Sequence, residues 1–423
     1  MRSDRVEPRL LIYSQDGLGL GHLRRTTLLA GEFLAARPDG SVLTISDSPL
    51  GQFFSAAAGH DYLKLPSIRK VGPGNWSPVS LSAPFPDVLT LRKETIRSVA
   101  LNFEPDVVLV DHMPHGAMGE LLPALEALDG TPARLVLGIR DIIDAPATVR
   151  RRWRLEGALE AVDSYFDDVL VYGAQDVFDV AKEYAWPAKI RDRLRYCGYV
   201  CGPSQAPAAD TVRTAYLAEH PDSRLIVAMA GGGADGYELF ETLLRAFPSL
   251  IADRPCVLVV VTGPFLPEAE RRSLQQLSAG LPVHLVSQVD DSLSYQGAAD
   301  LVIAMAGYNT TSEILSLGTR ALLVPRRGPS AEQQMRARRF AERGWVAWLP
   351  PASLSPEHLA TAVLDALDNP VDAATRPPDL LGRQRAARHL LDAGFRRVPD
   401  EEIFSPTGSD DLVGAGPPFL GKV

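Results

Sequence analysis

The sequence predicts an α/β protein made of two doubly wound, Rossmann-like domains that face each other across a cleft. Short apolar runs alternate with longer amphipathic segments along the chain, which is typical of βαβ units and parallel sheets. The runs are continuous, as in Val257–Val261, which suits strands covered by helices on both faces. Each half also begins with an apolar run followed by a glycine-rich turn. Ligands of such sheets bind beyond the carboxyl ends of the strands.

Ten apolar runs are expected to form strands, and five amphipathic segments are expected to form helices. The expected strands are Arg9–Ser14, Ser41–Ser46, Asp106–Val110, Arg134–Ile139, Asp168–Tyr172, Arg224–Ala230, Cys256–Thr262, Pro282–Val286, Leu301–Ala304 and Ala321–Val324. The expected helices are Leu23–Ala36, Glu238–Phe247, Glu268–Leu277, Thr311–Leu317 and Ala331–Arg343.

A stretch rich in proline, alanine and glycine at 202–210 separates the two halves. We therefore expect a first domain over residues 1–201, a linker over 202–210 and a second domain over 211–398. Residues 399–423 are rich in glycine, serine and proline and are expected to be disordered. The segment Gly72–Ser82, which also contains prolines, is expected to be a long loop bordering the cleft.

Composition excludes several classes of protein. The chain of 423 residues is long enough to bury two cores, and its net charge of −9 disfavours non-specific nucleic-acid binding. Its 3 cysteines are too few for a disulfide framework, and no second pair near Cys197 and Cys201 completes a zinc site. No apolar run approaches the length of a membrane span and no signal-peptide pattern follows Met1, so we expect a soluble, cytoplasmic protein.

The first glycine-rich turn, Gly17–His22, follows an expected strand and leads into a helix. Glycines there, among them Gly19 and Gly21, allow backbone to approach a ligand closely. One interpretation is a dinucleotide site for NAD or FAD with Asp47 on the ribose, but His22 replaces its third glycine. The other is that His22 transfers a proton, and an ordinary helix-start histidine remains a third.

The second glycine-rich turn, Gly231–Gly233, lies between an expected strand and an expected helix. Consecutive glycines before a helix form a cradle of N–H groups for an anion. The turn lacks the lysine of a P-loop, so a phosphate there would be held by backbone and the helix dipole. A turn that merely uses glycine is the alternative.

A polar segment after the expected strand 301–304 contains Thr310 and Glu313. Their spacing fits a helix-capping box, which is one interpretation. The other is that Glu313 accepts hydrogen bonds from a ribose diol, because a carboxylate accepts from two hydroxyls at once. Further along, Gln333 suits sugar hydroxyls, and Arg326 and Arg327 are either phosphate contacts or solvated surface.

Polar residues also follow the expected strand 106–110. Three candidates for a catalytic role lie there: Asp111, His112 and His115. Each could act as a general base, orient such a base, or contact the substrate that is deprotonated. A turn in which the aspartate caps a helix is the alternative. Arg140-Asp141 ends the next strand and is either part of the cleft rim or a surface ion pair.

The second half resembles family 28 glycosyltransferases of the GT-B fold. The matching motifs run in the family's order: Gly231–Gly233, Val286-Ser287-Gln288-Val289-Asp290-Asp291, Ala299–Val302, Gly307-x-x-Thr310-x-x-Glu313, Gly318, Pro325 and Glu332-Gln333-x-x-Arg336-Ala337. The resemblance covers roughly Leu225–Leu367, and the first half matches only through the turn that ends in His22.

The resemblance implies an inverting, metal-independent transfer of a hexose or N-acetylhexosamine from a nucleotide sugar, with UDP favoured, to a hydroxyl acceptor. It maps the diphosphate contacts to Gly232 and Gly233, with Thr310 beside them. It maps the ribose-binding acid to Glu313, and it places Gly307 in the same donor motif. No cofactor is implied, and no metal is assigned.

The resemblance also maps a sugar contact to Gln333 and a backbone contact with the nucleobase to Val289. Arg336 stands where the family often has asparagine, and it is assigned to the donor site, where its charge would face the leaving diphosphate. The family's Gly-Asn-Pro near the domain junction is Gly198–Val200 here. These two departures leave the identity of the sugar open.

On the first domain, the resemblance maps His22 near the reaction centre, and we favour it as the base over the segment that begins at Asp111. Asp111 is the second catalytic candidate. The resemblance assigns Gly19, Gly21 and His115 to the acceptor side of the cleft. Two other functions remain open: a nucleotide-sugar epimerase of the same fold and a non-catalytic sugar-nucleotide binding protein. The partners expected are a nucleotide sugar and a hydroxyl acceptor, with peripheral membrane contact if that acceptor is a lipid.

Overall fold

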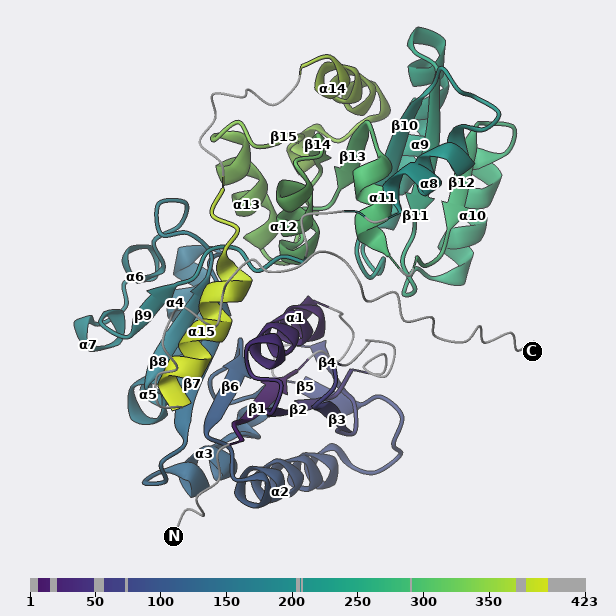
Figure 1. Cartoon of the computed structure of the whole chain (residues 1–423). Coiled ribbons are helices and arrows are strands. Elements are labelled where there is room, and N and C mark those ends of the chain that lie inside the picture. Colours follow the sequence, from purple (N-terminus) through teal and green to yellow (C-terminus); the bar gives the residue numbers. More distant parts are fainter. Residues whose placement is uncertain are drawn as a thin grey trace.

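The computed structural model describes residues 7–15, 21–48, 57–72, 75–202, 206, 208–289, 291–369 and 378–394. It contains two parallel sheets with helices on both faces, one in each half of the chain (Figure 1). The expected fold class is therefore confirmed. All ten expected strands form, and their bounds agree with the expected ones to within one residue at each end.

The first domain contains a seven-stranded parallel sheet in the order β3-β2-β1-β6-β7-β8-β9. Its strands are β1 (Arg9–Ser14), β2 (Ser41–Ser46), β3 (His60–Lys64), β6 (Val107–Asp111), β7 (Arg134–Arg140), β8 (Asp168–Tyr172) and β9 (Leu194–Tyr196). Its helices are α1 (Gly21–Ala36), α2 (Phe85–Phe103), α3 (Leu122–Leu128), α4 (Pro146–Leu155), α5 (Ala158–Tyr165), α6 (Val180–Glu183) and α7 (Ala188–Arg191). The strand order reverses between β1 and β6, which makes their carboxyl ends the switch point of this sheet.

The second domain repeats this topology with six parallel strands in the order β12-β11-β10-β13-β14-β15. Its strands are β10 (Arg224–Met229), β11 (Cys256–Val261), β12 (Val283–Val286), β13 (Leu301–Ala304), β14 (Ala321–Leu323) and β15 (Ala347–Trp348). Its helices are α8 (Ala209–Leu217), α9 (Tyr237–Asp253), α10 (Glu268–Ser278), α11 (Ser292–Ala298), α12 (Tyr308–Leu317), α13 (Glu332–Ala341) and α14 (Pro356–Asp368). The switch point lies between β10 and β13.

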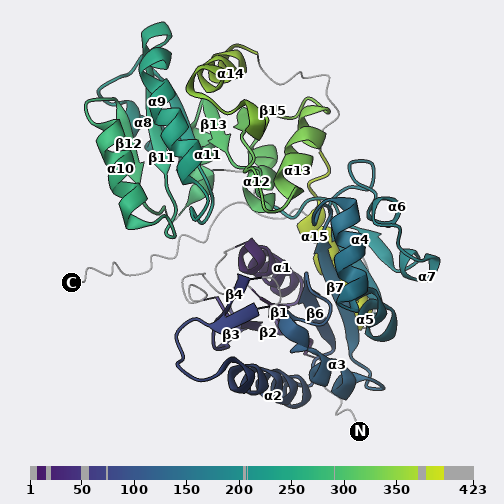
Figure 2. The same cartoon turned by 180° about the vertical axis from the view of Figure 1, so that it is seen from behind.

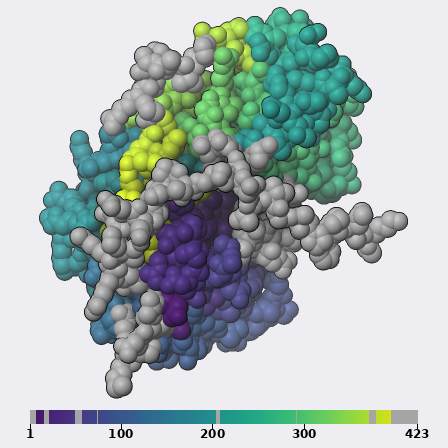
Figure 3. Space-filling view, viewed as in Figure 1, coloured from purple at the N-terminus to yellow at the C-terminus, as the bar shows by residue number. Residues whose placement is uncertain are grey.

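The last described helix, α15 (Gly382–Gly394), follows the second domain in sequence but packs on the first. It contacts α1, β6 and β7, and Arg383 pairs with Glu32 of α1 at 2.9 Å. Figures 1, 2 and 3 show α15 in yellow beside the first sheet and α1. The expected second domain, residues 211–398, includes α15 in sequence, whereas the contacts of this helix are with the first domain. The expected disordered tail lies outside the described residues.

The expected loop Gly72–Ser82 is wrong in part. Residues Ile68–Gly72 (β4) and Asn75–Pro78 (β5) form an antiparallel hairpin instead. Most of its side chains are exposed or half-buried, so the segment lacks the apolar run that marks the strands of the main sheets. Within the described part of the chain, no helix is both long and apolar enough to cross a membrane.

The packing of α15 yields a stability prediction. Leu390 is fully buried in the core that includes Leu10 and Ile12 of β1, whereas Leu381, next to α15, is 52% exposed. We expect Leu390→Ala to lower the free energy of unfolding by about 2–5 kcal/mol, because it opens a cavity in that core. Leu381→Ala is the matched control and should change it little. Denaturant unfolding of both variants checks this, and equal effects would contradict it.

Candidate active site

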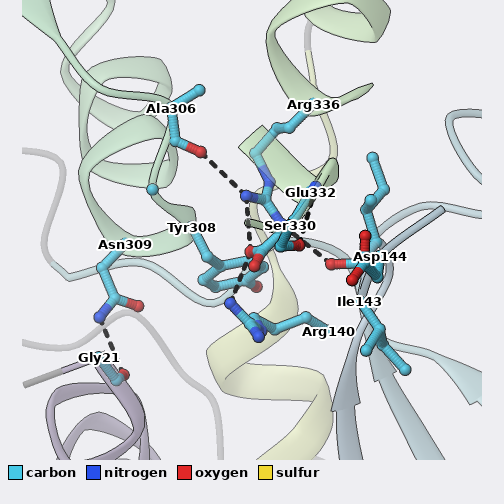
Figure 4. A network of polar contacts seen from close by, with 12 residues as sticks. Gly21, Arg140, Ile143, Asp144, Ala306, Tyr308, Asn309, Ser330, Glu332 and Arg336 are labelled. Carbon is cyan, nitrogen blue, oxygen red and sulfur yellow. Dashed lines mark hydrogen bonds and ion pairs between the residues drawn. The ribbon is translucent and has the colours of Figure 1, made fainter. Parts of the chain in front are cut away.

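The switch points of the two sheets face each other and are in direct contact. The Asn309 side chain, in the first turn of α12, donates a hydrogen bond of 2.9 Å to the Gly21 carbonyl oxygen at the start of α1 (Figure 4). α1 follows β1, and α12 follows β13, so both helices begin at the carboxyl edge where ligands of this fold bind. The candidates His22 on α1, Asp111 at the end of β6 and Glu313 on α12 therefore belong to the elements of these two edges.

His22, Arg25 and Asp111 form a polar cluster on the first domain. The Nδ1 atom of His22 lies 2.6 Å from Asp111 Oδ2, and the Arg25 guanidinium donates to both oxygens of Asp111 at 2.6 and 3.3 Å. Burial would raise the pKa of Asp111, but the charge of Arg25 and the hydrogen bond from His22 outweigh it and hold the pKa well below its usual range. An ionised Asp111 orients the His22 ring through Nδ1, so that Nε2 lies on the side of the ring away from Asp111.

The chain turns sharply after Asp111, the last residue of β6. His112 has a positive φ of 83°, unusual for a residue with a side chain, and its N–H donates to the Gly138 carbonyl at 2.8 Å. Its ring centroid lies 5.2 Å from that of His22. Burial and the charges of His22 and Arg140 lower the pKa of His112, which favours a neutral ring. His115 is half-buried, and its Nδ1 lies 3.0 Å from the Gly116 carbonyl oxygen.

Glu313 is a buried carboxylate of the second domain, at 3% exposure. Helix α12 begins at Tyr308 with Gly307 as its N-cap, so Thr310 lies inside the first turn and the capping-box interpretation is wrong. One oxygen of Glu313 accepts from Gln296 at 2.8 Å, and the other pairs with Arg24 of α1 at 2.6 Å. Burial raises the pKa of Glu313, against the charge of Arg24.

The second glycine turn is held by close backbone contacts. Gly231 and Gly233 have φ values of 61° and 90°, and a Cβ on Gly233 would lie 2.0 Å from the Thr262 carbonyl oxygen. The Gly232 carbonyl accepts from the Phe265 N–H at 2.9 Å. Helix α9 begins only at Tyr237, so three residues separate this turn from the helix. Glycine is thus required there by conformation and space.

The other residues predicted to bind the nucleotide-sugar donor also belong to the second domain. Gln333 is 9% exposed, and its side-chain oxygen accepts from the Arg326 N–H at 3.1 Å. Thr310 and Val289 are half-buried. Arg326 pairs with Asp235, and Arg327 pairs with Glu238 at 3.0 Å, so both arginines already face carboxylates beside the glycine turn.

Arg336 has a different environment from the one predicted. Its side chain has no exposed surface, lies 2.9 Å from Glu332 and 3.8 Å from Asp141, and donates to the Ala306 carbonyl at 3.0 Å (Figure 4). Arg140 of the first domain reaches the same Glu332 at 2.5 Å. Arg140-Asp141 is therefore part of a buried interdomain network and not a surface pair.

Two further sequence-based predictions concern residues of the first domain. Asp47, the ribose-binding acid of the dinucleotide interpretation, has no exposed surface and lies 3.4 Å from the buried Arg92. This burial counts against it as a ligand contact. Gly19 lies outside the described residues, whereas Gly21 opens α1 and meets Asn309.

Sequence reasoning missed Arg24, Arg25 and Gln296. The two arginines are adjacent and follow His22 near the start of α1. Two consecutive positive charges beside a glycine-rich turn were the sequence signal that could have identified them. Gln296 lies on α11, which the sequence pattern did not single out. Asp291, one of the two adjacent aspartates, caps that helix by accepting from the Leu293 and Ser294 N–H groups at 3.0 and 3.3 Å.

Comparison with known proteins confirms the resemblance of the second half. Residues 227–390 match the glycosyltransferase family 28 C-terminal domain. An uncharacterized glycosyltransferase of Methanopyrus kandleri is 27% identical over 271 residues, which are 62% of this chain and 64% of that protein. The N-acetylglucosamine transferase of Brucella anthropi that acts on N-acetylmuramyl-(pentapeptide) pyrophosphoryl-undecaprenol is 29% identical over 198 residues, 45% of this chain and 52% of that protein. The chain thus spans less than two thirds of either relative.

Solved structures share the fold over nearly the whole chain. MurG of Acinetobacter baumannii superposes with a TM-score of 0.52 and 15% identity, covering 93% of this chain and 96% of that one. The UDP-GlcNAc 2-epimerase of Methanocaldococcus jannaschii superposes with a TM-score of 0.58 and 12% identity, covering 90% of this chain and 99% of that one. Both domains therefore have the GT-B arrangement, which glycosyltransferases share with epimerases.

The buried network yields a prediction about Arg336. We expect Arg336→Ala to lower the free energy of unfolding by about 3–5 kcal/mol, because it leaves Glu332 and Asp141 buried without this cation. Arg338→Ala removes an exposed arginine from the same helix and should have little effect. Thermal and denaturant unfolding of the two variants measures the difference. An Arg336→Ala variant as stable as the wild type would contradict a structural role.

Proposed function

We propose that the chain is a metal-independent, inverting glycosyltransferase. It moves a hexose or N-acetylhexosamine from a nucleoside-diphosphate sugar, with UDP favoured, to a hydroxyl acceptor. The observation that carries this proposal is that α1 contributes to both sides of the site. His22 of α1 pairs with Asp111 at 2.6 Å, and Arg24, two residues further along α1, reaches the buried Glu313 of the opposite domain at 2.6 Å. The match of residues 227–390 to the family 28 domain supports the donor half of it.

The donor is assigned to the second domain. Glu313 accepts hydrogen bonds from the ribose hydroxyls, because a carboxylate has lone pairs for both. The turn at Gly232 and Gly233, with Thr310 nearby, is assigned to the diphosphate. The Gly233 N–H donates to the Ala230 carbonyl at 3.2 Å, so the Gly232 N–H is the donor on which this assignment relies. Gln333 contacts the sugar and Val289 contacts the nucleobase. The tight packing of the glycine turn supports this assignment, since preorganised donors stabilise charge without rearranging.

His22 is assigned as the general base of the first domain. Its Nε2 takes the proton of the acceptor hydroxyl while that oxygen attacks the anomeric carbon from the face opposite the diphosphate. The bond from the anomeric carbon to the diphosphate oxygen breaks, the electron pair leaves with the diphosphate, and the configuration inverts. Asp111 orients His22 and stabilises the imidazolium that forms. Gly21 and His115 are assigned to the acceptor side of the same edge.

A nucleotide-sugar epimerase is the second candidate, because epimerases share this fold. The two functions differ in their product. A transferase releases the nucleoside diphosphate in the presence of acceptor hydroxyls, whereas an epimerase keeps the sugar attached to the nucleotide. If the protein binds the nucleotide but shows no turnover with any acceptor, it is a binding protein and not an enzyme.

Nucleotide binding tests the donor site. Titration calorimetry with UDP, GDP, dTDP, NAD and FAD, without added metal, should show binding of one nucleoside diphosphate. Glu313→Gln should weaken that binding by about 1–3 kcal/mol, because the amide has no negative charge and replaces one acceptor oxygen with an NH2 donor. Glu241→Gln, on the surface of α9, is the matched control and should bind like the wild type. Binding of NAD or FAD instead of the diphosphates would refute the proposal.

Turnover tests the base. We expect His22→Gln to lower kcat by about 10²–10⁴-fold and to leave the affinity for the nucleoside diphosphate unchanged, because only proton transfer is lost. Release of UDP from UDP-sugars in the presence of a panel of hydroxyl acceptors provides the measurement. His284→Gln alters an exposed histidine of the second domain and should leave kcat at the wild-type value. Full activity of His22→Gln would show that another group takes the proton.

A further inference from the structure

Arg24 lies on the carboxylate that the proposed function assigns to the ribose. Its guanidinium pairs with Glu313 Oε1 at 2.6 Å and donates to the Ser292 hydroxyl at 2.8 Å. Arg24 belongs to α1 of the first domain, whereas Glu313 and Ser292 belong to α12 and α11 of the second. The contact therefore joins the two domains at the proposed donor site.

A ribose diol and Arg24 would use the same oxygen of Glu313. Oε2 accepts from Gln296, a fully buried side chain of the second domain that cannot move away without repacking. Oε1 is held by Arg24, whose side chain is 36% exposed and reaches the contact from the other domain. The Arg24 side of Glu313 is thus the side that a ligand can take over.

The position of Arg24 also bears on the charge of the donor. A nucleoside diphosphate brings negative charge close to Glu313, a carboxylate that is already buried. Two neighbouring arginines are fixed elsewhere, since Arg25 is buried against Asp111 and Arg336 is buried against Glu332. Arg24 is partly exposed and long enough to turn, and guanidinium groups bind phosphate oxygens well.

We propose that Arg24 is an exchangeable counter-ion of the donor site. It occupies Glu313 when the site is empty, yields Oε1 to the ribose diol when the donor binds, and then pairs with the donor diphosphate. This inference rests on the proposed function and adds a diphosphate contact from the first domain. It also couples donor binding to the interdomain contact, because the same side chain serves both.

Calorimetry with UDP and with uridine separates the two parts of this role. Removing Arg24 has two effects at once. It removes the side chain that competes with the ribose for Glu313, and it removes the proposed contact with the diphosphate. We therefore expect Arg24→Ala to bind UDP about tenfold more weakly than the wild type and to bind uridine at least as tightly. Arg24→Lys keeps the charge and should retain most of the affinity for UDP. Arg37→Ala removes an arginine that pairs with Asp39 just after α1, and it should bind both ligands like the wild type.

The outcomes distinguish this inference from the proposed function. A wild type that binds none of the nucleoside diphosphates would overturn both. A wild type that binds UDP, with an Arg24→Ala variant that weakens UDP and uridine equally or weakens neither, would overturn the role of Arg24 alone. If the wild type binds GDP and not UDP, GDP and guanosine take the places of UDP and uridine in this comparison. Thermal unfolding shows whether Arg24→Ala is folded, and Arg24→Lys provides the second test.

Discussion

The domain arrangement depends on two buried guanidinium groups that pack against one aromatic ring. Arg25 of the first domain and Arg336 of the second lie 5.3 and 5.5 Å from the centroid of the Tyr308 ring. Each cation is costly to bury without a partner, and each has one: Asp111 for Arg25 and Glu332 for Arg336. The Tyr308 hydroxyl accepts from the Val200 N–H at 2.9 Å, which ties the ring to the segment that leaves the first domain. These contacts hold the two sheets with the carboxyl ends of their strands facing each other.

The polar site is built on this arrangement. Arg25 packs on Tyr172 and Tyr308 and holds Asp111, and Asp111 in turn fixes the ring of His22. The cluster that contains the proposed base is therefore packed against Tyr308 of the opposite domain. The same domain interface includes the contact between Arg24 and Glu313, so both halves of the candidate site adjoin it.

The sequence predicts the strands of both sheets well and predicts the edges and the interdomain contacts poorly. Strands such as β11 are covered on both faces, so they must be continuously apolar and are visible in the sequence. The edge strands β3 and β9 have exposed positions and lack that signal. His22, Asp111 and Glu313 could be singled out as candidates because each follows an expected apolar strand at the ligand-binding edge. Arg336 could not be placed, because a buried arginine looks like a surface one until its partners from distant segments, Glu332 and Asp141, are known.

The location of the histidine bears on the choice between transfer and epimerisation. The fold is common to both, so it cannot decide between them. In a transfer, the base must reach the incoming hydroxyl, on the side of the sugar away from the diphosphate. His22 and Asp111 lie on the first domain, whereas Glu313 and the glycine turn lie on the second. A nucleotide held by the second domain would present its sugar toward the first, where a proton acceptor is already oriented. This division of the proposed donor site and the proposed base between two domains fits an attack from the far face of the sugar, and it favours our proposal of transfer.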